Sequence, residues 1–175
     1  MGVMIDGTYR ADDPGPDSVA GGAFGRAEAK IRHWISCDGS TGFPAEKGRY
    51  HLYVAWNCPW AHRALLVRVE KGLEDAISVS YARPRRTEHG WVYDTEGRYS
   101  DPLKGVSALH EVYAQDMDRY TGRVTVPVLW DKVADRAVSL ERAGMAAYFV
   151  RDAALAPHER EGLARFDAAV SYLRD

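Results

Sequence analysis

A single cysteine stands where a thiol could act as a nucleophile. Cys58 follows an aromatic and β-branched run and precedes Pro59, after which a helix-forming stretch extends from Ala61 to Lys71. This order predicts a thiol at a helix N-terminus, where unpaired N–H groups and about half a positive charge favour an anion. A cysteine so placed is typically a reactive thiolate, whereas one buried among apolar side chains is inert. We favour the reactive interpretation because the proline and the helix start adjoin the sulfur.

The residues around Cys58 limit what the sulfur could do. Ala61 stands where a Cys-x-x-Cys pair would have its second thiol. A lone thiol can still attack another sulfur and form a mixed disulfide that an external thiol resolves. Cys37 is distant along the chain, and two such cysteines make neither a disulfide scaffold nor a four-ligand zinc site. We therefore expect no metal and a reducing, cytoplasmic setting.

The elements that position Cys58 follow from hydrophobic periodicity. We expect strands at 49–56, 76–82, 123–131 and 136–140, a polar loop at 83–104, and helices at 26–36, 59–72, 106–117, 141–151 and 157–173. A strand–helix–strand start implies a parallel pair, and the short turn before the last strand implies an antiparallel one. The order β-α-β-α-β-β-α predicts an α/β, thioredoxin-like fold, with a four-stranded mixed sheet and helices on both faces. We place this domain at 49–151, after an irregular lead-in at 1–48 that packs on the core.

Composition narrows the class of protein. The 175 residues are 46% hydrophobic and 27% charged, with a net charge of −2. These values are ordinary for a soluble globular chain and give no field that would attract nucleic acid or an anionic membrane. No apolar run approaches the roughly 18–20 residues of a membrane-spanning helix. We therefore expect no nucleic-acid partner and no membrane partner.

Two further positions could serve a thiol ligand. Pro127 interrupts an otherwise regular strand. In thioredoxin-like folds a cis-proline opposite the helix start exposes the backbone of the preceding residue, here Val126, whereas a trans-proline at an edge or bulge is the alternative. Glu141 opens the predicted third helix, where free N–H groups would hold a carboxylate. It could equally be an acidic residue that only compensates the helix dipole.

Other polar and aromatic residues near Cys58 have plainer interpretations. His62 lies one helical turn after Cys58, and we interpret it as a packing or hydrogen-bonding residue rather than a base. The basic run Arg83-Pro84-Arg85-Arg86 is interpreted as a solvated loop, although it could lie near an anionic ligand. The tryptophans are expected mostly in the core, and two of them could also flank an aromatic ligand. They are Trp34, Trp56, Trp130 and the two possible flanking residues, Trp60 and Trp91.

Several blocks carry a family resemblance over residues 1 to about 141. They are Arg49–Val54, Cys58–Arg63, Lys71–Glu74, Gly90-Trp91 and Gly122–Lys132. These blocks resemble the glutathionyl-hydroquinone reductases, which are Xi-class, or omega-like, glutathione transferases. The resemblance implies that the cysteine attacks the sulfur of a glutathionyl-hydroquinone, keeps glutathione as a mixed disulfide, and is freed by a second glutathione. It further implies that Cys58 is the nucleophile, Trp91 contacts glutathione, Val126 pairs with its backbone, and Glu141 holds its γ-glutamyl end.

Two features depart from that family. The family has Glu-Ser-Ser at the third helix, and this chain has Glu141-Arg142-Ala143. A lost hydrogen bond to a charged group costs about 1.5–3 kcal/mol, or roughly tenfold to hundredfold in affinity. Arg142 could replace the contact as a cation or could indicate another low-molecular-weight thiol.

The family also continues as a long helical domain, of which we interpret 152–175 as the remnant first helix. We therefore expect a homo-oligomer or a partner chain to cover the exposed face.

Three hypotheses follow for function. The first is a glutathione-dependent thiol transferase or reductase that acts on an aromatic or quinone-like small molecule. The second is a diverged family member with a specialised, natural-product-like substrate. The third is a non-catalytic binding module that retains the fold, since fold alone does not determine function. The unbroken blocks around Cys58 and Pro127 favour the first.

Overall fold

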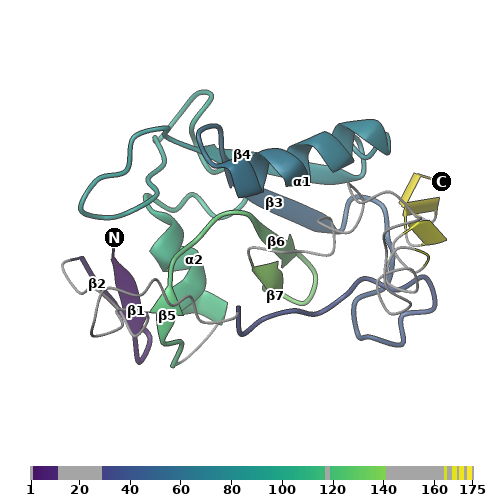
Figure 1. The fold of residues 1–175 in the computed structure, drawn as a ribbon, viewed down its shortest axis with the longest axis horizontal. Coiled ribbons are helices and arrows are strands. Elements are labelled where there is room, and N and C mark those ends of the chain that lie inside the picture. The colour runs from purple at the N-terminus through teal and green to yellow at the C-terminus, as the bar shows by residue number, and fades with distance from the viewer. Residues whose placement is uncertain are drawn as a thin grey trace, which may run out of the picture.

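A mixed four-stranded sheet, in the order β4-β3-β6-β7, lies at the centre of the computed structural model (Figure 1). The structure describes residues 2–11, 29–116 and 119–140, together with 164, 167, 168, 170, 171, 173 and 174. The elements are β1 (Val3–Ile5), β2 (Thr8–Arg10), β3 (Tyr50–Ala55), α1 (Pro59–Glu70), β4 (Ile77–Ala82), α2 (Leu109–Asp116), β5 (Gly122–Arg123), β6 (Val128–Asp131) and β7 (Arg136–Leu140). No helix in these described ranges has the length and hydropathy needed to cross a bilayer.

The strand β3 occupies the interior of this sheet. It pairs in parallel with β4 and antiparallel with β6, with Tyr50 opposite Asp131 and Tyr53 opposite Val128. All six residues of β3 are buried, as expected for a strand covered on both faces. The strand β7 adds antiparallel to β6. The parallel and antiparallel pairs confirm the predicted thioredoxin-like fold.

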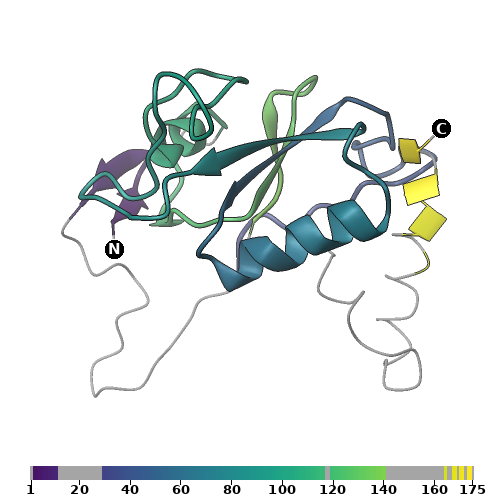
Figure 2. The ribbon, with the colours of Figure 1, turned by 90° about the horizontal axis from the view of Figure 1, so that it is seen from above.

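The helix α1 begins at Pro59 and ends before a glycine, as the sequence predicts. Gly72 has a φ of +63°, and its N–H donates to Val69 O at 2.9 Å, while Leu73 N–H donates to Arg68 O at 2.8 Å. This pair of bonds is a Schellman motif, which requires a residue in the left-handed region. Figure 2 shows α1 along one face of the sheet and α2 on the opposite side.

The prediction of a helix at 26–36 is wrong for the described residues 29–36. Arg32 forms an antiparallel bridge with Ser139. His33 N–H donates to Val138 O at 2.9 Å, and Leu140 N–H donates to Ile31 O at 3.1 Å. The strand β7 is at the sheet edge, where β6 pairs it on one side only. The segment at 29–36 bonds to the open side of β7 in an extended conformation, and these bonds outweigh its local helix preference.

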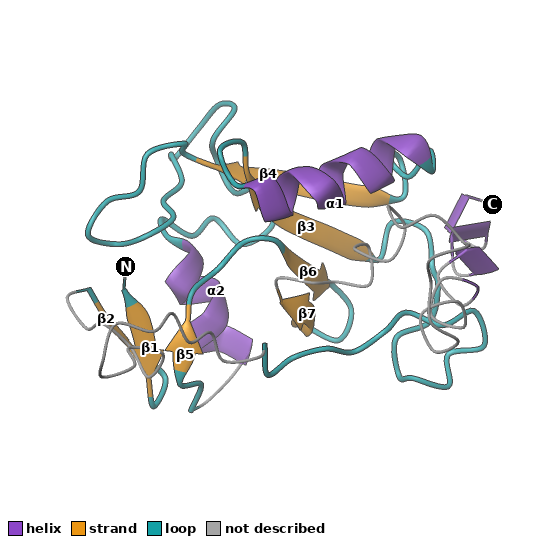
Figure 3. Ribbon diagram, viewed as in Figure 1, coloured by secondary structure: helices purple, strands orange, loops and turns teal. Residues whose placement is uncertain are grey.

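The lead-in is more regular than predicted. β1, β2 and β5 form a second, antiparallel sheet in the order β2-β1-β5 (Figure 3). The predicted strand at 123–131 is therefore two strands, because Gly122–Arg123 pairs with β1 whereas Val128–Asp131 pairs with β3. The helix expected at 106–117 begins later, at Leu109. Two tryptophans expected in the core are exposed, Trp34 by 42% and Trp56 by 51%.

The C-terminal helices fall partly outside the described residues. The helix expected at 141–151 lies outside them entirely. The described residues between 164 and 174 are helical, in agreement with the helix expected at 157–173. Val170 and Leu173 are buried and belong to the hydrophobic core.

Hydrogen bonds between polar side chains link β3, β4 and the loop that follows β4. His51 Nδ1 lies 2.8 Å from Ser78 Oγ and its Nε2 lies 2.8 Å from Ser80 Oγ, which donates to Asp101 Oδ1 at 2.9 Å. Because the Ser80 hydroxyl donates to Asp101, His51 Nε2 donates to Ser80 Oγ. Burial lowers the pKa of His51 to about 4 and favours the neutral ring. In that neutral ring Nδ1 accepts from the Ser78 hydroxyl, whose other acceptor, Tyr50 O, is farther away at 3.5 Å.

We predict that stability declines with acidity because of His51. An unfolded histidine, with a pKa near 6.5, takes up a proton between pH 6.5 and 4 that the folded chain does not bind. The unfolded state then holds more protons, so the free energy of unfolding falls through this window by up to about 3 kcal/mol. His110, whose pKa burial also lowers, adds to the fall.

Urea unfolding at pH 7 and pH 5 measures this effect. His51→Gln should reduce the loss of stability on acidification, and the matched change His62→Gln, at an exposed histidine, should leave it intact. An equal loss in all three proteins contradicts the assignment to His51.

Candidate active site

The thiol of Cys58 sits at the start of α1. Cys58 is the N-cap, with φ −99° and ψ 114°, and Pro59 follows it in the first turn. No side chain caps this end of the helix, and the first turn contains no acidic residue. The Cys58 N–H donates to Ala55 O at 3.1 Å, and the Cys58 carbonyl accepts from His62 N–H at 2.9 Å. The half-buried sulfur therefore faces helix amides that no carboxylate or hydroxyl of the first turn satisfies.

The segment between β5 and β6 lies opposite this helix start. The Cys58 Sγ–H donates a long, weak hydrogen bond to Val126 O, with 3.5 Å between sulfur and oxygen. The Val126–Pro127 peptide bond is cis. Among the described residues the Val126 N–H has no hydrogen-bond partner, so a backbone donor is available beside the sulfur.

Helix α2 holds that segment in place through one hydroxyl. Tyr113 Oη donates to Thr125 O at 3.0 Å and accepts from Thr125 N–H at 3.2 Å. Both Tyr113 and Thr125 are buried. A single phenol thus satisfies both backbone groups of the residue that precedes Val126.

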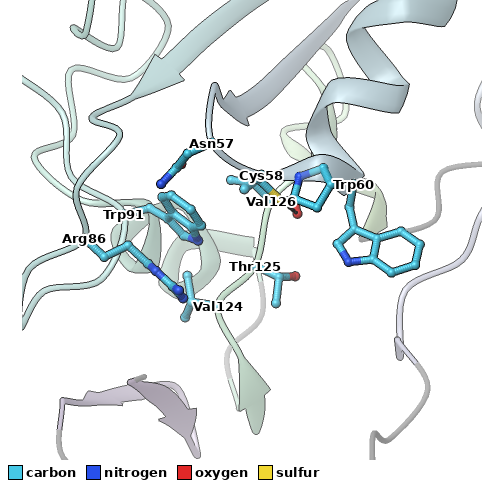
Figure 4. Close-up of a pocket in the computed structure, with 9 residues that line it drawn as sticks. Asn57, Cys58, Trp60, Arg86, Trp91, Val124, Thr125 and Val126 are labelled. Atoms are coloured by element: carbon cyan, nitrogen blue, oxygen red, sulfur yellow. Dashed lines mark hydrogen bonds between the residues drawn. The ribbon is translucent and has the colours of Figure 1, made fainter.

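These elements border a half-open pocket of about 230 Å³ (Figure 4). Its lining consists of Asn57, Cys58, Pro59, Trp60, Arg86, Trp91, Val124, Thr125 and Val126. Figure 4 shows Trp91 and Trp60 on opposite sides of Cys58. Two tryptophans therefore line the pocket that contains the sulfur, a setting suited to a flat or partly apolar ligand.

An arginine side chain lies against each of the two pocket tryptophans. Arg86 Cζ lies 4.9 Å from the centre of the Trp91 ring, and Arg63 Cζ lies 4.6 Å from that of Trp60, within the range of cation–π contacts. Among the described residues neither arginine pairs with a carboxylate. Arg86 is the one arginine, lysine or acidic residue in the described lining of the pocket. The pocket therefore favours an anionic ligand.

Most of the predicted site residues come together here. Cys58, Trp60, Trp91 and Val126 line the pocket, and Pro127 is buried directly after Val126. The candidates Glu141 and Arg142 lie outside the described residues. His62 is exposed on α1 and is not part of the lining.

Five lining residues were not among the predicted site residues. They are Asn57, Pro59, Arg86, Val124 and Thr125. The basic run at 83–86 was the signal for Arg86, and the block before Pro127 was the signal for Val124 and Thr125. Asn57 adjoins Cys58, and its side chain amide donates to Pro84 O, so it links the helix start to the loop that follows β4.

Comparison with known proteins decides the family. The family model described as the glutathione S-transferase N-terminal domain matches residues 57–150. The chain belongs to this family. It is a homologue of the glutathionyl-hydroquinone reductases and the Xi-class glutathione transferases.

Two curated reductases of this class are similar in sequence. A glutathionyl-hydroquinone reductase of Escherichia coli is 43% identical over 157 residues, which are 85% of this chain and 48% of that protein. One of Sphingobium chlorophenolicum is 42% identical over 142 residues, which are 81% of this chain and 44% of that protein. The chain therefore spans less than half the length of these two relatives.

Solved structures agree in fold. A Xi-class glutathione transferase from Natrialba magadii superposes with a TM-score of 0.73 at 38% identity, covering 99% of this chain and 46% of that one. The glutathione-bound structure of a glutathione transferase homologue from Escherichia coli gives 0.69 at 36% identity, covering 95% and 46%. That relative thus binds glutathione on the same fold.

We predict that Tyr113→Phe destabilises the pocket floor. The change leaves the buried N–H and C=O of Thr125 without their partner, which should lower the free energy of unfolding by about 1–3 kcal/mol. Tyr99→Phe is the matched control, since the Tyr99 hydroxyl makes no hydrogen bond among the described residues. Denaturant unfolding compares the two variants, and an equal, small loss in both contradicts the role given to Tyr113.

Proposed function

We propose that this chain is a glutathione-dependent thiol transferase or reductase in which Cys58 is the nucleophile. The observation that carries the proposal is the position of Cys58 Sγ, at an uncapped helix start and 3.5 Å from Val126 O, inside a pocket flanked by two tryptophans. A helix start stabilises the thiolate, which is the attacking form of cysteine. The similar reductases named above act, by their names, on glutathionyl-hydroquinones.

The reaction we propose has two sulfur transfers. In the first, the Cys58 thiolate attacks the sulfur of a glutathionyl-hydroquinone; a sulfur–sulfur bond forms, the sulfur–carbon bond breaks, and the hydroquinone leaves after taking a proton at that carbon. In the second, the thiolate of another glutathione attacks the glutathionyl sulfur of the mixed disulfide. Glutathione disulfide leaves and the Cys58 thiolate is restored. The ring carbon gains two electrons when its bond to sulfur is replaced by a bond to hydrogen. The thioether sulfur of the substrate and the thiol sulfur of the second glutathione each lose one electron in forming the disulfide, so electrons balance.

The remaining site residues receive roles in binding. We propose that the Val126 N–H pairs with the cysteinyl carbonyl of glutathione, because this donor lies beside the sulfur and has no partner among the described residues. Trp91 and Trp60 would flank the ligand from the two sides of Cys58. The assignment of the γ-glutamyl group to Glu141 and Arg142 rests on the family resemblance alone.

Intact mass spectrometry tests the nucleophile. Incubation with glutathione disulfide at neutral pH should add one glutathionyl group to the protein, and a glutathionyl-hydroquinone should give the same adduct while one equivalent of hydroquinone is released. Cys58→Ser should abolish both reactions and Cys37→Ser should preserve them, which separates the pocket thiol from the exposed one.

Each outcome of that test decides between the hypotheses. An adduct on Cys58 from both reagents supports the proposal. An adduct from glutathione disulfide without hydroquinone release contradicts the proposed acceptor and favours a specialised substrate. Absence of any adduct on Cys58 contradicts the thiol chemistry and favours a binding module.

We predict that Arg86→Gln slows reaction with glutathione disulfide by about two- to fivefold. An exposed contact between a guanidinium and a carboxylate is worth about 0.5–1 kcal/mol, which corresponds to this factor. Arg85→Gln is the matched control, because Arg85 is exposed in the same run and does not line the pocket. Cystamine, a disulfide without carboxylates, should show no such loss. Equal slowing with both disulfides would mean that Arg86 acts on the thiol rather than on the ligand.

A further inference from the structure

We propose that the N-terminal β1–β2 hairpin is a clamp that sets the spacing of two walls of the Cys58 pocket, and that Tyr9 is its positioning residue. The hairpin contributes no residue to the pocket lining. It touches instead the segment that leads into Val126 and the loop that carries Arg86 and Trp91. The inference concerns the shape of the pocket, and only its affinity measurement rests on the proposed function.

The first contact is with the pocket floor. In the small sheet, Val3 pairs with Arg123 and Met4 with Gly122. Three pocket-lining residues, Val124, Thr125 and Val126, follow β5 directly along the chain. Val3 and Met4 are 0% and 1% exposed, so β1 is anchored in the interior rather than laid over the surface. Figure 3 shows β1 between β2 and β5, beside α2.

The second contact is with the wall opposite the sulfur. Tyr9 Oη donates to Glu88 O at 2.9 Å. Glu88 lies in a tight turn in which Thr87 and Gly90 exchange backbone hydrogen bonds of 3.1 and 3.0 Å, and Trp91 is the next residue. A bond to the turn therefore restrains the backbone immediately before the indole.

Gly90 allows this close approach. It has a φ of +77°, and a Cβ at this position would lie 3.1 Å from Tyr9 Oη. Both the backbone conformation and the space favour glycine. A side chain at position 90 would therefore crowd the Tyr9 hydroxyl.

The ring of Tyr9 contacts α2 as well. It stacks on the imidazole of His110 in α2, with ring centres 4.1 Å apart and planes 10° from parallel. Leu109, the first residue of α2, donates its N–H to Trp91 O at 2.9 Å. Tyr9 therefore contacts both elements that hold the Trp91 backbone, the turn before it and the helix to which it is bonded.

The clamp is separate from the nucleophile. Cys58 belongs to the start of α1, which the large sheet positions, whereas the clamp acts on Trp91 and on the segment at 124–126. Loss of a clamp contact should therefore weaken the affinity of the pocket for a ligand and leave the intrinsic reactivity of the Cys58 sulfur unchanged. Tyr9→Phe is a suitable probe because it removes the bond to Glu88 O and retains the stacked ring.

Two measurements that need no ligand test the clamp. In Tyr9→Phe, amide hydrogen exchange at Thr87 and Gly90 should accelerate by about two- to tenfold, the factor for one lost hydrogen bond. The fluorine resonance of Trp91 in 5-fluorotryptophan-labelled protein, assigned with Trp91→Phe, should move or broaden while that of Trp60 stays. Thr8→Ala, at an exposed neighbour on β2, should change neither. Unchanged exchange and resonances, or exchange that rises equally in β3, overturn the proposal.

The affinity measurement links the clamp to the proposed function. In steady-state turnover of a glutathionyl-hydroquinone, Tyr9→Phe should raise KM by about two- to tenfold and leave kcat unchanged. The rate of Cys58 alkylation by iodoacetamide should also be unchanged. A fall in kcat or in alkylation rate with KM unaltered overturns the clamp. If the wild-type protein does not react with glutathione, the proposed function fails, and the exchange and fluorine measurements still decide whether the clamp exists.

Discussion

The antiparallel register of β3 against β6 is the constraint on which the site depends. Tyr53 of β3 lies opposite Val128 of β6. If the same register is continued past Val128, Val126 lies opposite the end of β3. There the Cys58 N–H donates to Ala55 O, and the chain turns into α1 with the sulfur 3.5 Å from Val126 O. A slip of one residue would turn every side chain of the strand to the opposite face. It would also part the thiol from the backbone segment it faces.

A buried ion pair supports that register at the other end of the two strands. Arg49, next to β3, binds Asp131 at the end of β6 with two nitrogens, at 2.9 and 2.7 Å from the same carboxylate oxygen. Asp131 is fully buried and also accepts from the N–H groups of Val133 and Ala134. Burial alone would raise the pKa of Asp131, but these bonds outweigh it and leave the pKa below its ordinary value. Such a carboxylate tolerates few alternative pairings, because a slipped strand would leave it buried without its partner.

Local signals predicted the parts of the molecule that local interactions determine. Pro59 and Gly72 mark the two ends of α1 in the sequence as well as in the structure. Asp6-Gly7, both with positive φ, was a readable hairpin signal, but strands of three residues show no usable alternation and their partner β5 is distant along the chain. Contacts between distant parts of the chain determined the features that the sequence did not predict. Bonds to β7 hold the segment at 29–36 in an extended conformation. The conformation of the loop after β4 determines that Arg86 is the residue of the basic run that lines the pocket. Aromatic character alone did not predict burial, since Trp56 stacks on Tyr81 at 4.5 Å and still faces solvent.

A crystal structure of the protein after treatment with glutathione disulfide tests the central claim most directly, because it locates both the bond and the ligand. The account predicts a disulfide between Cys58 Sγ and the glutathione sulfur. It also predicts that the Val126 N–H donates to the cysteinyl carbonyl of the ligand and that the peptide lies between Trp60 and Trp91. Glutathione attached to Cys37 alone, or held on Cys58 but directed away from Val126 and the two indoles, would contradict it.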